Sequence, residues 1–531
     1  MWGNGSPQAF GASQSWFESR HPSHLTTMRR TDTVEERCVR NVIILAAGEG
    51  KRMKSSVPKV LHPLLGRTLL GHVLAAAEPF LDHGTVAVVV GHGGDQVREH
   101  LAEVAPEVVA VTQAERRGTG HAVRIALEAA PELTGTVVVL NGDIPLLRPD
   151  TLAALVHTHE AWKASATVLT AEVADPTGFG RIVRNRGGEF SAIVEERDAT
   201  PAQRAIREIN SGAYVFEAAA LREMLGKLST DNEQGEEYLT DVIGMLAAAG
   251  APIVAHRSPD ATETLGANDR AELAGLRAIM RDRINDEWMR SGVAIIDPAT
   301  TWIDVTVRLE RDAVIEPNVH LRGATSIGEG AVIGPDTSLI DVVVGPGAAV
   351  VRTHAVSSEI GPQASVGPFA YLRPGTQLGR KSKVGTFVET KAATLGEGAK
   401  VPHLSYVGDA TIGEHTNIGA ATVFVNYDGV RKQRSVIGAH ARTGADNMFV
   451  APVHVGDGAY TAAGSVIIKD VPPGALGVSR APQRNIEGWV ERKRSGSAAA
   501  QAARAALDAA GGEEEHGGAG QVGETLPRDE Q

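Results

Sequence analysis

The stretch that decides the fold reads Ile327-Gly328-Glu329-Gly330-Ala331-Val332 and then Ile333-Gly334-Pro335-Asp336-Thr337-Ser338. Each hexapeptide begins with an aliphatic residue followed by glycine, and a small residue stands four positions after the aliphatic one. The same six-residue beginning recurs downstream at Ile360-Gly361, Val366-Gly367, Leu378-Gly379, Val384-Gly385, Leu395-Gly396, Val407-Gly408, Ile412-Gly413, Ile418-Gly419, Ile437-Gly438 and Val455-Gly456.

A six-residue period excludes the two common patterns, since a helix repeats every 3.6 residues and a simple strand every two. It suits a coil with three flat faces, in which three hexapeptides make one turn and the aliphatic residues point into a narrow core. A glycine-rich β-sandwich with accidental spacing is the alternative, and the number of in-phase repeats disfavours it. The sequence therefore predicts a left-handed parallel β-helix of hexapeptide repeats.

Length and composition limit the remaining possibilities. A chain of 531 residues is too long for one core, so two or three domains are expected. Aromatic residues make up only 4%, which fits a β-helix whose interior is too thin for large rings. The single cysteine, Cys38, excludes an intramolecular disulfide and indicates a reducing cytoplasm. A net charge of −12 without a basic block argues against nucleic acid as a partner.

Membrane and export signals are missing from the sequence pattern. No run of about eighteen apolar residues occurs, so no membrane span is expected. The first forty or so residues lack the apolar region of a signal peptide.

The segment from residue 39 to 266 has a different pattern, in which short apolar runs alternate with helical stretches. Strands are expected at 41–46, 85–90, 108–112 and 136–141, with helical stretches at 69–81, 94–103 and 118–130. This alternation predicts a doubly wound, Rossmann-like α/β domain with a parallel sheet. Ligands of such sheets bind beyond the carboxyl ends of the strands, so the loops after Ala46, Thr112 and Asn141 should share one cleft.

Three further segments complete the predicted domain organisation. Residues 1–38 are read as a disordered extension. Residues 267–290 carry apolar residues at helical spacing among many charges and are read as a linker helix. The β-helix domain is placed at 291–490, and residues 491–531 are read as an Ala-rich and then disordered tail.

A glycine-rich turn follows the first strand and reads Leu45-Ala46-Ala47-Gly48-Glu49-Gly50-Lys51-Arg52-Met53, with Pro58-Lys59 beyond it. Glycines let a backbone approach a ligand closely, and the free N–H groups of such a turn bind phosphate. The turn is neither a Rossmann fingerprint, because Met53 replaces the third glycine, nor a Walker A loop, because Arg52 replaces its Ser or Thr. An ordinary strand-to-helix turn remains the alternative.

This turn resembles the opening motif of sugar-nucleotide pyrophosphorylases, and further matching segments follow in order. They are Gln113, Gly118-Thr119-Gly120-His121, Asn141-Gly142-Asp143, Gly178-Phe179-Gly180-Arg181, Glu195, Asn210-Ser211-Gly212 and Asn268. Together with the hexapeptide repeats, residues 42–489 resemble the family of bifunctional N-acetylglucosamine-1-phosphate uridylyltransferases / glucosamine-1-phosphate N-acetyltransferases.

The resemblance implies a uridylyltransferase site in the α/β domain. Arg52 and Lys59 would be catalytic, stabilising the phosphates of UTP and the leaving pyrophosphate, while Asp143 and Asn268 would bind Mg²⁺. The implied residues that bind UTP and UDP-GlcNAc are Leu45, Ala46, Ala47, Gly48, Lys59, Gln113, Gly118, Thr119, Asn141, Gly142, Asp143, Gly180, Glu195, Asn210 and Asn268.

Several positions interrupt the hexapeptide pattern, and interruptions of a regular scaffold point to function. Arg373 occupies a glycine position, Tyr406 replaces a small residue, and residues 424–435 form an insertion that must leave the coil. The resemblance implies that His403 is the general base for the amine of glucosamine-1-phosphate. It implies that Arg373, Lys391, Tyr406, Asn417 and Lys432 bind this substrate, and that Ala420, Asn426, Tyr427, Ala445, Ala463 and Arg480 bind acetyl-CoA.

Three positions depart from the family pattern. Ala421 and Val425 stand where the family usually has Gly and Cys, and neither is expected to affect the chemistry. Ala445 stands where a serine hydroxyl is usual at the coenzyme site, so weaker binding of acetyl-CoA is expected.

The function implied by the resemblance is a cytoplasmic, homotrimeric enzyme that acetylates glucosamine-1-phosphate and then transfers uridylyl from UTP. Its product, UDP-N-acetylglucosamine, feeds peptidoglycan and other cell-envelope polysaccharides. Two alternatives remain: a nucleotidyltransferase whose β-helix serves only for assembly, and a non-catalytic regulatory subunit. His403 and Lys391 argue against the first, and Arg52, Lys59 and Asp143 argue against the second.

Overall fold

The structure is a computed structural model that describes residues 40–79, 84–131 and 133–514. The chain divides into two compact units, Met1–Met280 and Arg281–Gln531. The division falls within helix α8 (Arg270–Arg290), which lies where a linker helix is predicted. The predicted disordered extension at 1–38 and the end of the tail at 515–531 lie outside the described residues.

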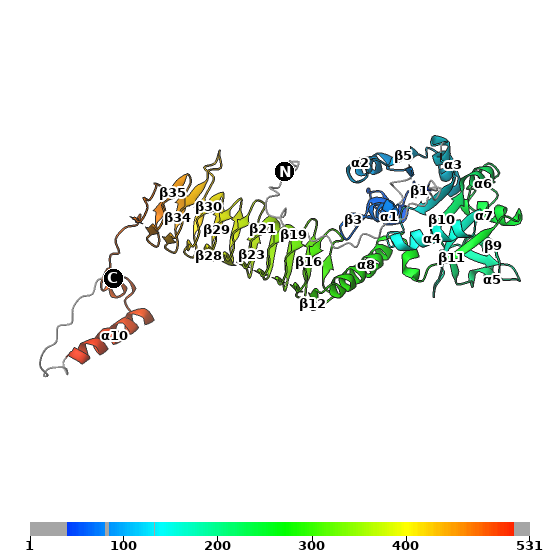
Figure 1. Ribbon diagram of the computed structural model, residues 1–531. Helices are drawn as coiled ribbons and strands as arrows, with labels where there is room; N and C mark the ends of the chain where they lie inside the picture. The colour runs from blue at the N-terminus through cyan, green and yellow to red at the C-terminus, as the bar shows by residue number, and fades with distance from the viewer. Residues whose placement is uncertain (1–39, 80–83, 132, 515–531) are drawn as a thin grey trace. The chain divides into compact units, whose positions relative to one another are not determined.

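The first unit is built on one mixed sheet (Figure 1). The four predicted strands are present, and β1 pairs in parallel with β4 and β6, as β4 does with β5. One later strand, β10, runs antiparallel to both neighbours, which the predicted alternation did not include. The order across the sheet is β11 (Ile253–Arg257), β7 (Ala166–Glu172), β10 (Glu208–Glu217), β6 (Thr136–Asn141), β1 (Arg40–Ala46), β4 (Val86–Val90) and β5 (Val109–Thr112).

Helices cover both faces of this sheet because its strands are apolar on both sides. On β6, Val138 and Leu140 join one buried cluster, while Val137 and Val139 join the other. The first cluster is completed by α1 (Leu69–Ala77), α2 (Gly94–Val104) and α4 (Pro149–Ala161). The second is completed by α3 (Thr119–Ala129), α6 (Ala218–Leu225) and α7 (Leu239–Ala248). This is the predicted doubly wound α/β architecture.

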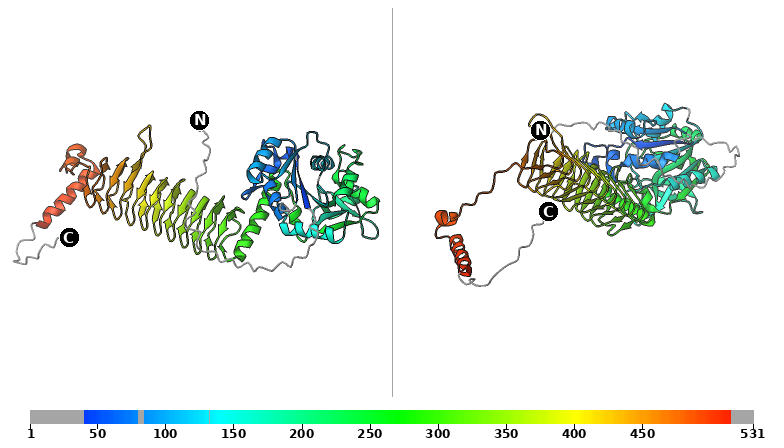
Figure 2. Two further views of the ribbon diagram at one scale, coloured as in Figure 1. Left: turned by 45° about the horizontal axis from the view of Figure 1, so that its top comes forward. Right: turned by 60° about the vertical axis from the view of Figure 1, so that its left-hand side comes forward.

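The second unit is a parallel β-helix, as predicted. Its coils stack in one direction, and the strands of each coil pair in parallel with those of the next (Figure 2). One face comprises β14 (Arg308–Leu309), β17 (Ser326–Ile327), β19 (Thr337–Val344), β21 (Thr353–Ile360), β24 (Gln377–Leu378), β27 (Thr394–Leu395), β30 (Ala410–Ile412), β32 (Ser435–Ile437) and β35 (Val453–Val455).

Two further faces complete each coil. The second comprises β13 (Trp302–Ile303), β16 (Val319–Arg322), parts of β19 and β21, β23 (Ala370–Leu372), β26 (Glu389–Lys391), β29 (Tyr406–Gly408), β31 (Val423–Val425), β34 (Met448–Val450) and β37 (Val466–Ile467). The third runs from β12 (Ala294–Ile295) through β15 (Val314–Ile315), β18 (Val332–Ile333), β20 (Ala349–Val350), β22 (Ser365–Val366), β25 (Lys383–Thr386) and β28 (Lys400–His403) to β33 (Arg442–Thr443), β36 (Tyr460–Thr461) and β38 (Leu476–Gly477).

The coil length stays close to three hexapeptides, apart from one much longer step. Leu378 pairs with Leu395, and Leu395 with Ile412, whereas the next partner of Ile412 is Ile437. The longer step accommodates the predicted insertion, but its bounds are narrower than the predicted 424–435, because Phe424 and Val425 belong to β31 and Ser435 begins β32. The loop of residues 426–434 projects from the coils in Figure 2. Ile437 then pairs with Val455, so the coil resumes its register after the insertion.

The interior of the β-helix is filled as the pattern predicts, with one correction. Ile327, Ile333 and Thr325 are buried, so aliphatic and small residues line the core. The expectation that large rings do not fit is wrong for the last coils. There Phe424 and Phe449 are fully buried, and their ring centroids lie 5.1 Å apart on neighbouring coils.

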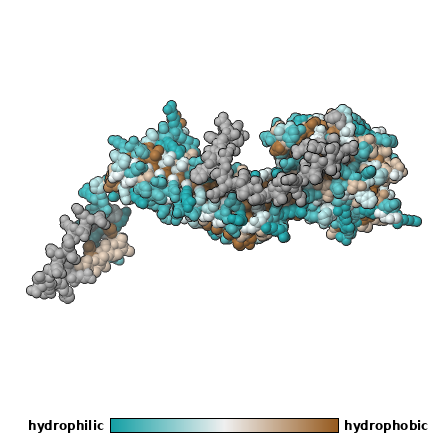
Figure 3. Space-filling model, viewed as in Figure 1, coloured by the Kyte–Doolittle hydropathy of each residue, from teal (hydrophilic) through white to brown (hydrophobic). Residues whose placement is uncertain are grey.

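The surface of the β-helix is mainly hydrophilic on the face shown in Figure 3, with small separate hydrophobic patches. One corner carries Phe369, Phe387 and Leu404 on successive coils, each exposed and each with a positive φ angle. The rings of Phe369 and Phe387 stack with centroids 5.4 Å apart. Beyond the coils, α9 (Trp489–Arg494) and α10 (Ala498–Glu514) follow, so the Ala-rich segment is helical. In the described part of the chain, no helix has the length and apolar character needed to cross a membrane.

Candidate functional sites

The first site lies at the carboxyl ends of β1 and β6. Leu45 and Asn141 are neighbours across these two strands, and the N–H of Gly142 donates to the carbonyl of Leu45 over 2.9 Å. Gly212 packs so closely on Asn141 that a side chain at 212 would overlap the Asn141 amide. The predicted segments around Leu45, Asn141 and Asn210-Ser211-Gly212 are thus brought together by the sheet.

The glycine-rich turn is held close to Lys59. Gly50 has a φ of 63°, and a Cβ at this position would lie 2.6 Å from Cβ of Lys59. Only glycine fits such a close approach at a left-handed φ. Lys51–Met53 and Lys59–Leu61 form two short 3-10 helices, η1 and η2, in this region. Arg52 lines a pocket of about 580 Å³ with Met53, Lys54, Asp269 and Arg270.

The ammonium group of Lys59 joins the two predicted metal ligands. It donates to the amide oxygen of Asn268 over 2.9 Å and forms an ion pair with the carboxylate of Asp143. Both oxygens therefore face one cation, and their side chains come from segments far apart in the sequence. Among the described residues, no cluster of three or more His, Cys, Asp or Glu side chains could hold a metal ion. Mg²⁺ keeps several waters and is commonly held by one or two carboxylates together with substrate phosphates, so it does not require such a cluster.

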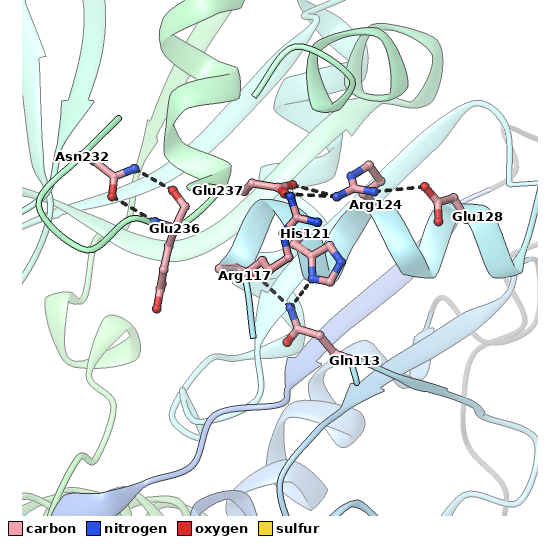
Figure 4. A network of polar contacts seen from close by, with 9 residues as sticks. Gln113, Arg117, His121, Arg124, Glu128, Asn232, Glu236 and Glu237 are labelled. Carbon is pink, nitrogen blue, oxygen red and sulfur yellow. Dashed lines mark hydrogen bonds and ion pairs between the residues drawn. The ribbon is translucent and has the colours of Figure 1, made fainter. Parts of the chain in front are cut away.

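The segment predicted to recognise the uracil follows β5 and opens α3. The Gln113 amide nitrogen lies 3.1 Å from the Gly118 carbonyl oxygen, to which it donates, and 3.1 Å from Nδ1 of His121 (Figure 4). Thr119 accepts a hydrogen bond from the N–H of Leu239 over 3.0 Å. Gly118 has a φ of 107°, and a side chain there would overlap the backbone of Glu237.

Sequence reasoning missed the residue that supports this segment. The nearly buried carboxylate of Glu237 lies 2.9 Å from guanidinium nitrogens of both Arg117 and Arg124 (Figure 4). Its carbonyl also accepts the N–H of Gly120 over 2.8 Å. No motif marks Glu237 in the sequence, because it comes from a loop more than a hundred residues downstream of the segment that it holds.

The residues predicted to bind the sugar form a third cluster in this unit. The N–H of Asn210 donates to the carbonyl of Gly180 over 2.9 Å, and Glu195 accepts from the hydroxyl of Thr240 over 3.1 Å. Burial raises the pKa of the Glu195 carboxyl, and the charges of Asp198 and Asp241 add to the rise, while the Thr240 hydroxyl opposes it. Thr240 is a second residue that sequence reasoning missed.

The second site follows the coils of the β-helix. Arg373, Lys391 and Tyr406 lie on the same face of three successive coils. Arg373 donates to Glu389 over 3.0 Å, and this hydrogen bond is the main cause of the raised pKa of the guanidinium. Lys391 lies 3.0 Å from both carboxylate oxygens of Asp409, which sequence reasoning also missed.

His403 lies around a corner from this face. It ends β28 and is exposed, Leu404 makes the corner, and Tyr406 begins β29 on the next face. The predicted coenzyme residues continue from His403 along the coil axis. The carbonyl of His403 accepts the N–H of Ala421 in the next coil. In the same way Ala420 accepts from Asp446, and Ala445 accepts from Gly464. Asn417 lies on the third face, bridging Lys400 and Arg442. Ala463 follows Ala445 in the next coil.

The insertion carries Asn426, Tyr427 and Lys432. Tyr427 and Lys432 face each other in an antiparallel bridge, and Tyr427 donates to the carbonyl of Gly429 over 2.6 Å. At its tip, Asp428 accepts the N–H groups of Arg431 and Val430, and these bonds lower its pKa. Arg480 is exposed after the last coil and lies near Gly464.

Comparison with known proteins gives concordant results for both units. A family model described as a MobA-like NTP transferase domain matches residues 42–285. A protein named "Bifunctional protein GlmU" from Streptomyces avermitilis is 60% identical over 467 residues, which is 88% of this chain and 97% of that protein. Its namesake from Streptomyces coelicolor is 59% identical over 475 residues, 89% of this chain and 98% of that protein. The protein of this name from Corynebacterium efficiens is 55% identical over 469 residues, which is 88% of this chain and 96% of that protein.

Proposed function

The chain belongs to the GlmU family of bifunctional proteins, and from this premise we propose how its residues carry out two reactions. The protein is an acetyltransferase and a uridylyltransferase of UDP-N-acetylglucosamine synthesis, with acetyl-CoA and nucleotide substrates. A nucleotidyltransferase with a purely structural β-helix would not match relatives of this name along nearly their whole length.

One observation carries the assignment of residues to reactions. Lys59, Asp143 and Asn268 meet in the first unit, while Arg373, Lys391 and Tyr406 follow one another on the β-helix. Uridylyl transfer needs cations and a metal position around the phosphates, and the first group supports this with one cation, Lys59, and two oxygens suited to Mg²⁺. We therefore place uridylyl transfer in the α/β domain, proposed as residues 39–266, and acetyl transfer in the β-helix, proposed as residues 291–490.

In acetyl transfer, His403 acts as the general base on the exposed end of β28. Its imidazole takes a proton from the amine of glucosamine-1-phosphate while the amine nitrogen bonds to the thioester carbonyl carbon. The carbon–sulfur bond then breaks, and the thiolate of coenzyme A leaves and takes up the proton. Arg373 and Lys391 neutralise the sugar phosphate, and Tyr406, Asn417 and Lys432 orient the sugar. Ala420, Asn426, Tyr427, Ala445, Ala463 and Arg480 contact the coenzyme.

In uridylyl transfer, the glycine-rich turn and Arg52 hold the triphosphate of UTP. An oxygen of N-acetylglucosamine-1-phosphate bonds to the α-phosphorus, the bond from this phosphorus to the bridging oxygen breaks, and pyrophosphate leaves. Lys59 stabilises the charge that develops. Gln113, Gly118 and Thr119 recognise the uracil, and Gly180, Glu195 and Asn210 bind the sugar.

We propose Mg²⁺ as the metal, bound by Asp143 and Asn268. The fit of these residues rests on their two oxygens, which already face a single cationic group, the Lys59 ammonium. When bound, the ion would neutralise phosphate charge. Lys59 would then turn from these oxygens toward the phosphates.

The assembly and location follow from the β-helix and from the composition. We propose a homotrimer, because the flat faces of a three-sided β-helix can pack around a threefold axis. We also propose a cytoplasmic enzyme, since the chain has one cysteine and its substrates are small phosphorylated molecules.

Two variants of the full chain test the assignment of the two reactions to different units. Asp143→Ala should abolish formation of UDP-N-acetylglucosamine and leave acetyl transfer unchanged, whereas His403→Ala should do the reverse. Matched controls are Asp150→Ala, on the exposed start of α4, and His454→Ala, at an exposed position of β35. Loss of both activities in either folded variant would contradict the two-site assignment.

A further inference from the structure

A single carboxylate connects two groups of residues on the β-helix. Asp409 follows β29 at a corner of the coil, with a φ of 48°. Its two oxygens lie 3.0 Å from the ammonium of Lys391, and one of them accepts from the amide of Asn426 over 2.5 Å. Lys391 is assigned above to the sugar phosphate and Asn426 to acetyl-CoA.

The backbone of Asp409 holds the same elements. Its N–H donates to the carbonyl of Lys391 over 2.9 Å, and its carbonyl accepts the N–H of Ser435 over 3.1 Å. Asn426 stands near the start of the insertion and Ser435 at its end. One residue therefore binds both ends of the loop, and a hydrogen bond from Gln433 to the Asn426 carbonyl closes the base between them over 2.8 Å.

We propose that Asp409 is a positioning residue for acetyl transfer, which aligns the sugar-phosphate lysine with the loop that contacts the coenzyme. The inference rests on the proposed assignment of acetyl transfer to the β-helix. Asp409 itself contacts neither substrate in this proposal.

The charges and burial of the pair support this role. The side chains of Lys391 and Asp409 are 20% and 18% exposed, so the ion pair is largely shielded from water. Charge-assisted hydrogen bonds of this kind are stronger and more directional than neutral ones. Both oxygens of the Asp409 carboxylate lie 3.0 Å from the ammonium, which fixes the position of the Lys391 nitrogen and leaves N–H donors for another group. Asn426 also contacts a third proposed substrate residue, since its amide nitrogen lies 3.4 Å from the hydroxyl oxygen of Tyr406.

An aspartate at a left-handed corner has a simpler explanation, because Asp and Asn tolerate this backbone conformation better than most residues. Asp341 separates the two explanations. It occupies the same corner on an earlier coil, with a φ of 54°, and its carboxylate accepts the N–H of Ala324 over 2.8 Å. If the corner alone required the residue, Asp341 and Asp409 would respond alike to substitution.

The test compares Asp409→Asn with Asp341→Asn in the full-length protein. Asparagine keeps the shape and the backbone preference and removes the charge. For Asp409→Asn we expect the KM values for glucosamine-1-phosphate and for acetyl-CoA each to rise about ten- to hundredfold, the range for hydrogen bonds to charged groups. Uridylyl transfer should not change. Asp341→Asn should alter neither activity.

Limited trypsin digestion supplies a readout that does not depend on activity. The insertion contains Arg431, Lys432 and Arg434, and its cleavage should accelerate in Asp409→Asn but not in Asp341→Asn. Unchanged KM values and unchanged cleavage in Asp409→Asn would overturn the proposal, as would equal effects of the two variants. If the unsubstituted protein lacked acetyltransferase activity, the proposed function would fail instead, and the cleavage result would still report whether Asp409 anchors the loop.

Discussion

The ammonium nitrogen of Lys59 lies 2.9 Å from the amide oxygen of Asn268, although 209 positions separate the two residues in the chain. Asp143, from a third segment, contacts the same ammonium. The fold brings the three segments together, so the Asp143 carboxylate and the Asn268 amide oxygen both face the Lys59 ammonium.

Removal of the metal should separate the two reactions. A chelator should stop uridylyl transfer and leave acetyl transfer unchanged, because the proposed metal ligands belong only to the first unit. Asn268→Ala should raise the Mg²⁺ concentration needed for half-maximal uridylyl transfer about tenfold or more. Asn185→Ala, in the exposed turn after β8 (Arg181–Arg184), is the control and should not alter this requirement. Equal Mg²⁺ requirements in all three proteins would exclude Asn268 as a ligand.

Glu195 should make the stability of the first unit depend on pH. Its folded-state pKa is raised above the ordinary 4.5, mainly by burial. The stability that Glu195 contributes is therefore fully present below the unfolded pKa and is lost as the pH rises through the folded pKa. Glu195→Gln should then melt at a higher temperature than the unsubstituted protein at about pH 7, with the difference shrinking toward about pH 4.

The control residue for this effect is Glu208, whose pKa is shifted in the opposite direction. Burial raises the pKa of Glu208, but the hydrogen bonds and charge of Arg184, the Thr170 hydroxyl and the charge of Arg257 together lower it overall. The stability that Glu208 contributes is therefore present above its unfolded pKa and is lost on acidification. Glu208→Gln should melt at a lower temperature than the unsubstituted protein at about pH 7. Calorimetric melting curves of the three proteins across this range check both signs. The same direction in both variants would contradict the assignment.

Ala445→Ser should lower the KM for acetyl-CoA. Ala445 is exposed, so a hydroxyl can be added without crowding, and a neutral hydrogen bond contributes about 0.5–1.5 kcal/mol, or a two- to tenfold change in KM. Asn447 cannot substitute for the hydroxyl, because it is buried and its side chain bonds to Ala462 and Thr461. A steady-state titration of acetyl-CoA with the variant and the unsubstituted protein measures this difference in KM. A large change in kcat would mean that residue 445 lies closer to the thioester than proposed.

Light scattering should give a mass of three chains. The exposed corner of Phe369, Phe387 and Leu404 adds apolar area to the flat faces, and association is the usual way to cover such area. A stable monomer with full acetyltransferase activity would contradict the trimer.

Both tails should be dispensable. The proposed site residues all lie between 45 and 480, and α10 packs on α9, as the contact of Arg504 with Glu491 illustrates. A protein of residues 28–495 should keep both activities at unchanged KM values. Loss of one activity in a folded trimer of this length would show that a tail completes a site.

The sequence predicted most of the architecture because periodicity depends on local spacing. The hexapeptides predicted the β-helix, and alternating apolar runs predicted β1, β4, β5 and β6 with their parallel pairing. It did not predict the later strands β7, β10 and β11. It also did not predict the antiparallel direction of β10, since such pairing within a mixed sheet leaves no local mark. The buried pair Phe424 and Phe449 was also missed, because two large rings fit only where neighbouring coils both provide room.

The residues that support the two sites could not be predicted from the sequence, for a related reason. Glu237, Thr240 and Asp409 act through residues that are distant in sequence, so neither a motif nor a spacing identifies them. By contrast, the glycine-rich turn was recognisable because Gly50 must approach Lys59 closely within one short segment.

The loop of residues 426–434 leaves the coil after β31 and returns at β32, and the next coil keeps its register. Because both ends are attached to Asp409, the middle of the loop can gain or lose residues while the distance between its ends stays fixed. Loop length can therefore change without any change to the repeats that fold the domain.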